Sequence, residues 1–432
     1  MTNFSIFVHP FQNAMYKFQR FLKILGPSIL YAGAAIGVSH LVQSTRAGAL
    51  FNFDLVWVLI LANLLKYPFF EYGARYAVTT GKNLVQGYES IGRWAVMLYA
   101  LLTVLSMFII QATVTVVTVG LIAYVFNLTI PLINLSVVVL VVAMLILVIG
   151  KFSLLDKVMK LIMVLLALST IVAVFAALGI HQEVSPDELI NFTWTRQADI
   201  FFLIAFVGWM PAPIDISVWS SLWNLAKIEE LGYKPDLKST LIEFRFGYIG
   251  TAVLALGFLV MGALVMHGTG EQLSPNGTTF SGQLINMYTT SLGSWAYWIV
   301  SIAALTTMVS TTITVLDAYP RVLMSTYSIL FKPDGQHLKH EGLPYLIGMV
   351  VMVIGASVII AYAARSMVFM VTLATTISFL MAPIFAWLNY RVITSRQMPL
   401  EAQPGLFLKI LSWMGIFFLV VFSLIYLYWT FL

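Results

Sequence analysis

Eleven stretches of about 20 apolar residues recur along the chain, and they constrain its fold more than any other feature of the sequence. A run of this length forms an α-helix that crosses the hydrocarbon core of a bilayer, which is about 30 Å thick. Charged residues make up 9% of the chain, whereas a soluble domain carries about a quarter. A soluble surface cannot be built from so few charges, so the sequence predicts an all-α polytopic membrane protein.

The predicted spans occupy residues 25–47, 54–77, 94–125, 132–150, 155–180, 199–224, 246–268, 293–325, 343–364, 366–391 and 407–431. No loop between them is long enough to fold alone, so we expect one transmembrane domain over residues 1–432. With the N-terminus in the cytoplasm, only Arg46, Arg196 and Arg365 of the basic residues fall outside. This asymmetry predicts a multi-pass protein of the cell (inner) membrane with an external C-terminus. It also explains the net charge of +5 without a nucleic-acid partner.

The sixth predicted span is interrupted by the stretch FVGWMPAPIDISVW, residues 206–219. Pro211 and Pro213 lack a backbone donor and clash with the preceding turn. We therefore expect the carbonyl groups of residues 206–210 to lose their helical partners. Such backbone is tolerated within a bilayer only where it is buried in protein or lines a cavity. The first span has a matching weak point from Gly33 to His40, where small and mildly polar residues replace the apolar run.

The two interruptions lie five spans apart, and a repeat with an odd number of spans must be inverted in the membrane. We therefore expect two inverted five-helix repeats, over about 25–180 and 199–391, followed by an extra helix over about 407–431. Secondary transporters of the LeuT type are built in this way, with the substrate site at the midplane between the two broken helices. The alternative is a pair of proline kinks that only shape helix packing.

The chain resembles the NRAMP family of proton-coupled divalent metal transporters over nearly its whole length. The resemblance is best in GPSILYAGAAIGVSHLVQSTRAGALFNFDLVWVLILANLL, residues 26–65, which is similar to the family in its opening Gly-Pro and in its second span. The family's Met-Pro-His of the sixth span looks like Met210-Pro211-Ala212. The resemblance implies a LeuT-type fold and secondary active transport by alternating access, and we expect a monomer.

The metal ligands of the family are missing from this sequence. The family's Asp-Pro-Gly-Asn motif in the first span falls on Gly37, Val38, Ser39 and His40. Its sixth-span histidine falls on Ala212, while the methionine persists as Met210. A transition metal wants carboxylate or imidazole ligands beside soft sulfur. The resemblance therefore implies a divergent transporter in which no transition-metal site is expected.

We expect the substrate, a small inorganic ion, to bind between the two interruptions, at Gly37, Val38, Ser39, His40, Gly208, Met210, Pro211, Ala212 and Asp215. Helix N-termini that begin near Ser39 and Pro213 offer N–H groups and partial positive charge, which favour an anion such as bicarbonate. His40 would add a donor, or would instead bond a neighbouring helix.

A proton-coupled divalent cation transporter is the alternative, for Mg²⁺ ahead of Mn²⁺. Asp215 and the carbonyl groups near Ile36 and Gly208 would then supply the oxygen ligands that Mg²⁺ requires. A second role is open to Asp215, because a carboxylate at a helix N-terminus also caps that helix.

The eighth span predicts a site for a coupling ion. Its hydroxyl groups at residues 307, 310, 311 and 314 follow the spacing of one helical face. In LeuT-type carriers a sodium ion lies between first-span carbonyls and eighth-span hydroxyls. By that resemblance the candidate ligands for a bound Na⁺ are Ala34, Gly37, Thr307, Ser310 and Thr311. These hydroxyl groups have an alternative role as hydrogen-bonding contacts between helices. No other cofactor is expected.

Charged residues within the second and eighth spans predict an inner gate or a structural network, formed by Lys66, Glu71, Arg75, Asp317 and Arg321. Glu71 and Arg75 are four residues apart and should pair, whereas Asp317 has Arg321 or Lys66 as its partner. The paired aspartates, Ser-His pair or histidine-rich helix of an intramembrane protease is missing, so no enzyme is expected. Interruptions at matching positions of the first and sixth spans are more typical of an alternating-access transporter than of a channel.

Overall fold

The predicted spans fold as α-helices in the computed structural model, which describes residues 26–150, 152–179, 191–269, 273–332, 342–364 and 366–431 and has no β-strand within them. In chain order the helices are α2 (Pro27–Ala35), the π-helix η1 (Ser39–Ser44), α3 (Thr45–Phe51), α4 (Val56–Thr80), α5 (Leu84–Glu89), α6 (Arg93–Val125), α7 (Leu132–Val148), α8 (Phe152–Ala177), α9 (Gln197–Gly208), α10 (Ile216–Leu231), α11 (Leu237–Val265), α12 (Gly277–Leu292), η3 (Ser294–Ala296), α13 (Tyr297–Phe331), α14 (Leu343–Ala363), α15 (Met367–Ile393), η4 (Leu400–Ala402) and α16 (Leu406–Phe431).

The sidedness of the chain stays a prediction. Residues 1–25, most of the loop at 181–198 and Arg365 lie outside the described residues. Within the described part, six helical stretches are long and apolar enough to cross a membrane by length and composition: α6, α11, η3 with α13, α14, α15 and α16. The second span, α4, carries several buried polar and charged side chains, and the first and sixth spans are each divided in two.

Helix boundaries follow side-chain caps that hydropathy does not register. The seventh span begins at Leu237 rather than near residue 246, because the Asp236 carboxylate accepts a hydrogen bond of 2.9 Å from the Ser239 N–H. Charged Glu243 and Arg245 are thereby included in α11. Asn276 caps α12 in the same way, through the N–H groups of Thr278 and Thr279. This helix was not among the predicted spans, because it is short and its sequence is polar.

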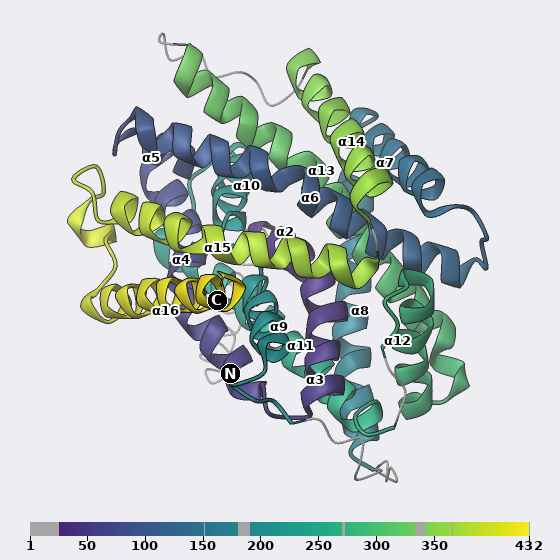
Figure 1. Cartoon of the computed structure of the whole chain (residues 1–432). Helices are drawn as coiled ribbons and strands as arrows, with labels where there is room; N and C mark the ends of the chain where they lie inside the picture. The colour runs from purple at the N-terminus through teal and green to yellow at the C-terminus, as the bar shows by residue number, and fades with distance from the viewer. Residues whose placement is uncertain are drawn as a thin grey trace, which may run out of the picture.

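The first and sixth spans are broken, as predicted. α2 ends at Ala35 and η1 begins at Ser39, while α9 ends at Gly208 and α10 begins at Ile216. In the second break the prolines deny the backbone donors that a continuous helix needs. α2 lies at the centre of the bundle, where it packs against α10, α11 and α13 (Figure 1). The two breaks are therefore brought together inside the protein, which confirms the expected LeuT-type arrangement.

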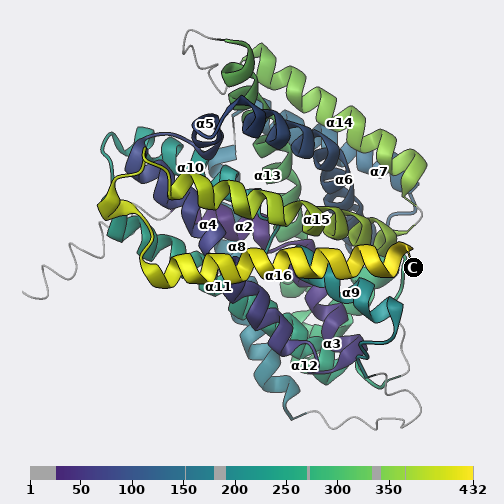
Figure 2. The ribbon, with the colours of Figure 1, turned by 60° about the vertical axis from the view of Figure 1, so that its left-hand side comes forward.

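Peripheral helices present apolar side chains to the outside. α16 runs across the outside of the bundle, and α14 lies at another edge (Figure 2). Exposed Leu, Ile, Val and aromatic residues follow α7, α14 and α16, including Val142, Ile354 and Phe417. Such a surface would be unfavourable in water and matches the hydrocarbon of a bilayer. The polar groups are concentrated inside, at the breaks and around α4.

Candidate functional site

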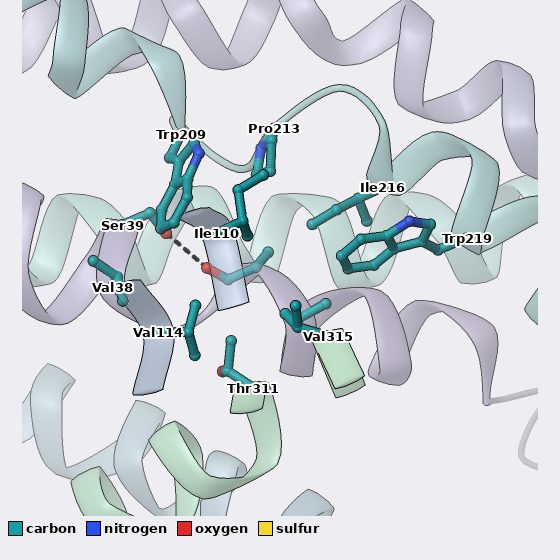
Figure 3. A pocket seen from close by; sticks show the side chains of 12 residues that line it. Val38, Ser39, Ile110, Val114, Trp209, Pro213, Ile216, Trp219, Thr311 and Val315 are labelled. Carbon is teal, nitrogen blue, oxygen red and sulfur yellow. Dashed lines mark hydrogen bonds between the residues drawn. The ribbon is translucent and has the colours of Figure 1, made fainter. Parts of the chain in front are cut away.

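A small cavity lies where the two breaks meet (Figure 3). The space open to the centre of a water molecule is about 20 Å³, which suffices for about one water. Helices α2, α6, α10 and α13 and both breaks contribute to its walls. The lining residues are Ala34, Ala35, Val38, Ser39, Ile110, Val114, Trp209, Pro213, Ile216, Trp219, Thr311 and Val315.

The cavity wall is mainly apolar and holds few polar groups. Ser39 and Thr311 supply hydroxyl groups. The Trp209 indole is engaged elsewhere, since its N–H donates to Ser378 Oγ at 2.8 Å. The Trp219 indole N–H is buried and has no hydrogen-bond partner in the described part of the chain. No Asp, Glu or Lys side chain lines the cavity, so it offers hydroxyl and N–H groups rather than carboxylate ligands.

Three of the expected substrate-binding positions, Met210, Pro211 and Ala212, are buried in the sixth-span break. The Pro211 carbonyl accepts a hydrogen bond of 3.3 Å from Ser39 Oγ, which joins the two breaks directly. The structure brings Val38 and Ser39 into the cavity wall, together with Pro213 from the opposite break. Within the described residues, no group of three or more His, Cys, Asp or Glu side chains could hold a metal ion.

Lys66 reaches the sixth-span break from α4. Its side chain is fully buried, and Nζ donates to four carbonyl oxygens at 2.9–3.2 Å: those of Val207, Gly208, Met210 and Ala212. The sequence predicted free carbonyl groups at residues 206–210 and placed Lys66 in an inner gate or a structural network. The prediction was wrong for the carbonyls of Val207, Gly208 and Met210, because the Lys66 ammonium bonds them. About 140 residues separate the two segments in sequence, so no local pattern indicates this contact.

His40 faces away from the cavity. Its Nε2 lies 2.9 Å from the Thr251 carbonyl oxygen on α11, and Nδ1 lies 2.7 Å from Ser39 Oγ. A carbonyl only accepts, so Nε2 carries a proton and donates it to Thr251. Of the two roles left open by the sequence, the structure therefore supports a bond to a neighbouring helix.

Asp215 precedes the first residue of α10, but its side chain forms no capping hydrogen bond there. Instead Oδ2 accepts from the Tyr319 hydroxyl on α13 at 3.1 Å. Oδ1 is buried without a partner in the described residues. The capping role that the sequence left open for Asp215 is not formed as a side-chain hydrogen bond. The carboxylate instead links the second half of the broken span to α13.

Thr311 connects the eighth span to the first break. Its hydroxyl lies 3.0 Å from the Gly33 carbonyl, 3.4 Å from that of Ile36 and 3.0 Å from that of Thr307. These two first-span carbonyls each precede a predicted coupling-ion position, Ala34 and Gly37, by one residue. Ser310 is buried on the same helix. A Cβ on Gly37 would lie 2.9 Å from Thr311 Oγ1, so only glycine permits this approach.

The predicted charged network divides into two separate groups. Glu71 pairs with Arg75 at 2.5 Å, as expected, and with Arg245 at 3.6 Å. Asp317 pairs with Arg321 at 2.8 Å and accepts a hydrogen bond from Tyr345. Lys66 belongs to neither group.

Glu243 is a buried functional residue that the sequence did not predict. Its Oε1 accepts hydrogen bonds from the backbone N–H groups of Gly26 and Ser28, at 3.1 and 2.9 Å. A carboxylate from α11 thus caps the N-terminus of α2, where the helix dipole favours negative charge. Nothing in the local sequence indicates this contact, which spans more than 200 residues.

Replacing Glu243 by glutamine is expected to loosen the first half of the first span. The neutral amide gives up the charge-assisted bonds to α2, at a cost of about 1–2 kcal/mol. The chain has no cysteine, so a single Ala34→Cys substitution reports on the cavity. Maleimide labelling of Ala34→Cys should become several-fold faster with Glu243→Gln and stay unchanged with Glu230→Gln, whose carboxylate is exposed. Equal rates in all three proteins would contradict the capping role.

Comparison with known proteins agrees with this geometry. The family described as natural resistance-associated macrophage protein-like matches residues 28–429. An uncharacterised protein of Pasteurella multocida, PM0681, is 35% identical over 409 residues, covering 93% of this chain and 91% of that protein. The divalent metal cation transporter MntH of Acidiphilium cryptum is 33% identical over 61 residues, 14% of each chain.

Solved structures show the same fold. A mutant of the Eremococcus coleocola manganese transporter superposes with a TM-score of 0.68 at 14% identity, covering 94% of this chain and 86% of that one. The nucleobase-cation-symport-1 transporter Mhp1 superposes with a TM-score of 0.57 at 14% identity, covering 94% and 92%. The family match extends over both broken spans and α16. This chain therefore belongs to the NRAMP family and is a multi-pass membrane transporter rather than an enzyme.

Proposed function

We propose that this NRAMP-family protein is a monomeric carrier of a small inorganic anion, bicarbonate for example, which it moves together with sodium across the cell membrane. The observation that carries the proposal is the composition of the cavity between the breaks. Its walls hold hydroxyl groups, an unpartnered indole N–H and the first residues of two helices, but no carboxylate. A helix N-terminus carries partial positive charge and attracts anions. The first N–H groups of α10 already bond the carbonyls of Pro213, Ile214 and Asp215, so the attraction here comes from the helix dipole.

Charge at the sixth-span break supports the same conclusion. In a broken helix the exposed carbonyl oxygens are the natural ligands of a cation. Here the Lys66 ammonium already occupies four of them. Relatives are named for divalent metal ions and manganese, but Mn²⁺ prefers carboxylate, carbonyl and water ligands, and no carboxylate lines this cavity. The cavity holds about one water, so binding of a larger ion requires the walls to part during alternating access.

The contact between Thr311 and the first break supports sodium as the coupling ion. The carbonyl oxygens of Gly33, Ile36 and Thr307 surround the Thr311 hydroxyl oxygen at 3.0–3.4 Å. An oxygen-only group of this kind suits a hard cation. In the present arrangement the Thr311 hydroxyl bonds these carbonyls itself, and its proton would turn away when sodium binds.

Mg²⁺ transport coupled to protons is the second candidate, and one observation favours it. Asp215 is buried and its Oδ1 lacks a partner in the described residues. A largely hydrated Mg²⁺ needs one or two carboxylates and retains several waters. Asp215 would be its single acidic ligand at the breaks, whereas Gly208 and Met210 cannot serve because their carbonyls bond Lys66.

Uptake into proteoliposomes tests the proposal. Radiolabelled bicarbonate, Mg²⁺ and Mn²⁺ would each be offered with and without an inward sodium gradient. We expect bicarbonate to accumulate at least tenfold above protein-free vesicles when sodium is present, and Mn²⁺ to remain at the background. Vesicles with an inward proton gradient and no sodium provide the control. Sodium-independent uptake of Mg²⁺ or Mn²⁺ without bicarbonate uptake would overturn the proposal in favour of the second candidate.

A further inference from the structure

The environment of Lys66 is that of a bound cation rather than of a surface lysine. The side chain is fully buried, and four carbonyl oxygens surround Nζ at 2.9–3.2 Å. Two of them belong to the last residues of α9, Val207 and Gly208, and two to the break that follows, Met210 and Ala212. An ammonium group has three N–H donors, so one donor is shared between two of the oxygens. A neutral amine has only two donors and would leave carbonyls unsatisfied.

Electrostatics at the break are consistent with a fixed positive charge. α9 ends at Gly208, where the last carbonyl groups carry the partial negative charge of a helix C-terminus. A buried, charged lysine is expensive in a membrane protein unless such partners surround it. The break therefore supplies the complete solvation shell of one cation.

We propose that the Lys66 ammonium is a resident cation of the sixth-span break, and that its removal opens a binding site for a small monovalent cation. The carbonyl oxygens that a transported cation would use are permanently occupied by a side chain of the second span. Lys66 is thus a positioning and specificity-determining residue: it holds the unwound segment in shape and excludes cations from it. This inference deepens the proposed function, because the fixed charge leaves only the cavity beside the break for a substrate.

Chemical rescue tests the proposal. Lys66→Ala removes the ammonium together with its aliphatic stem and leaves a space that methylammonium or ammonium can fill. The thermal midpoint of the purified variant would be measured in detergent with 100 mM sodium, ammonium, methylammonium or N-methylglucamine chloride. We expect a midpoint lowered by several degrees that rises with ammonium or methylammonium and not with the bulky N-methylglucamine. The midpoint of the unaltered protein should not respond.

Two further variants distinguish the loss of the Lys66 charge from the creation of an empty buried space. Leu65→Ala creates a buried space on the neighbouring residue, and its midpoint should not respond to any of the four salts. Lys66→Met keeps the stem volume without the charge, so it should be destabilised and not rescued. Rescue of Leu65→Ala to the same extent as Lys66→Ala, or no rescue of Lys66→Ala by any small cation, would overturn the proposal.

Lys66→Gln provides a second route if Lys66→Ala does not survive extraction. The amide keeps two donors but no charge, so the variant should fold with a lower midpoint and should lose most sodium-coupled anion uptake. An unchanged midpoint in Lys66→Gln would overturn the proposal. The rescue experiment does not use the transported ion. Failure of bicarbonate uptake by the unaltered protein would therefore refute the proposed substrate while leaving a successful rescue of Lys66→Ala as support for the resident cation.

Discussion

Thr311→Val is expected to weaken sodium binding and so to raise the sodium concentration that transport requires. Valine has the shape of threonine but no hydroxyl, so the oxygen that meets the Gly33 and Ile36 carbonyls disappears. Loss of one ligand from a small oxygen site should raise the sodium concentration for half-maximal uptake at least tenfold, which corresponds to about 1.4 kcal/mol. The measurement is a sodium titration of anion uptake in proteoliposomes.

Thr312→Val is the matched control for Thr311→Val. Thr312 is the next residue of α13, is also buried, and its hydroxyl lies 2.7 Å from Thr118 Oγ1 on α6. Its replacement removes a comparable hydrogen bond on another face of the same helix. Both variants should lose similar stability, about 1 kcal/mol, but only Thr311→Val should shift the titration. A sodium titration of Thr311→Val that superimposes on that of the unaltered protein would remove α13 from the coupling mechanism.

The fold could be predicted from the sequence because each membrane helix is specified by its own run of apolar residues. A continuous apolar run predicts a span whatever its neighbours are. Pro211 and Pro213 predict a break from their own chemistry, and the structure ends α9 at Gly208 and starts α10 at Ile216. The pairing of Glu71 with Arg75 was predictable for the same reason, since four residues along one helix determine it.

The contacts that define the site could not be predicted from the sequence, because they join segments that are far apart along the chain. Nothing near residue 66 indicates that its ammonium meets carbonyls 140 residues further along the chain. Glu243 likewise caps a helix that begins more than 200 residues before it. His40 and Asp215 were recognised as unusual residues in a bilayer, but their orientations depend on α11 and α13. Local sequence therefore located the breaks and missed the groups that satisfy them.

Gly208→Ala is expected to be one of the most damaging single-methyl substitutions in the chain. A Cβ at this position would lie 2.2 Å from the Thr375 carbonyl oxygen on α15, which is backbone and cannot rotate away. α9 and α15 would have to separate, and overpacking of this kind costs about 1–3 kcal/mol or more. The Gly208 carbonyl is also a ligand of Lys66, so displacement of the backbone disturbs the break itself.

Gly250→Ala is the control for Gly208→Ala. It tests whether the loss of stability comes from the clash with the Thr375 carbonyl or from any replacement of glycine by alanine. Gly250 lies within α11, and a Cβ there would meet nothing within 4 Å. Alanine is the better helix former by about 1 kcal/mol, so this control should be as stable as the unaltered protein or more so.

Thermal unfolding in detergent and uptake in proteoliposomes would be measured for both. Gly208→Ala should lose several degrees and most of its transport, because the first half of the sixth span must lie against α15 for the carbonyls of the break to reach Lys66. If both variants unfolded at the same temperature, close packing of α9 on α15 would not be what holds the break in place.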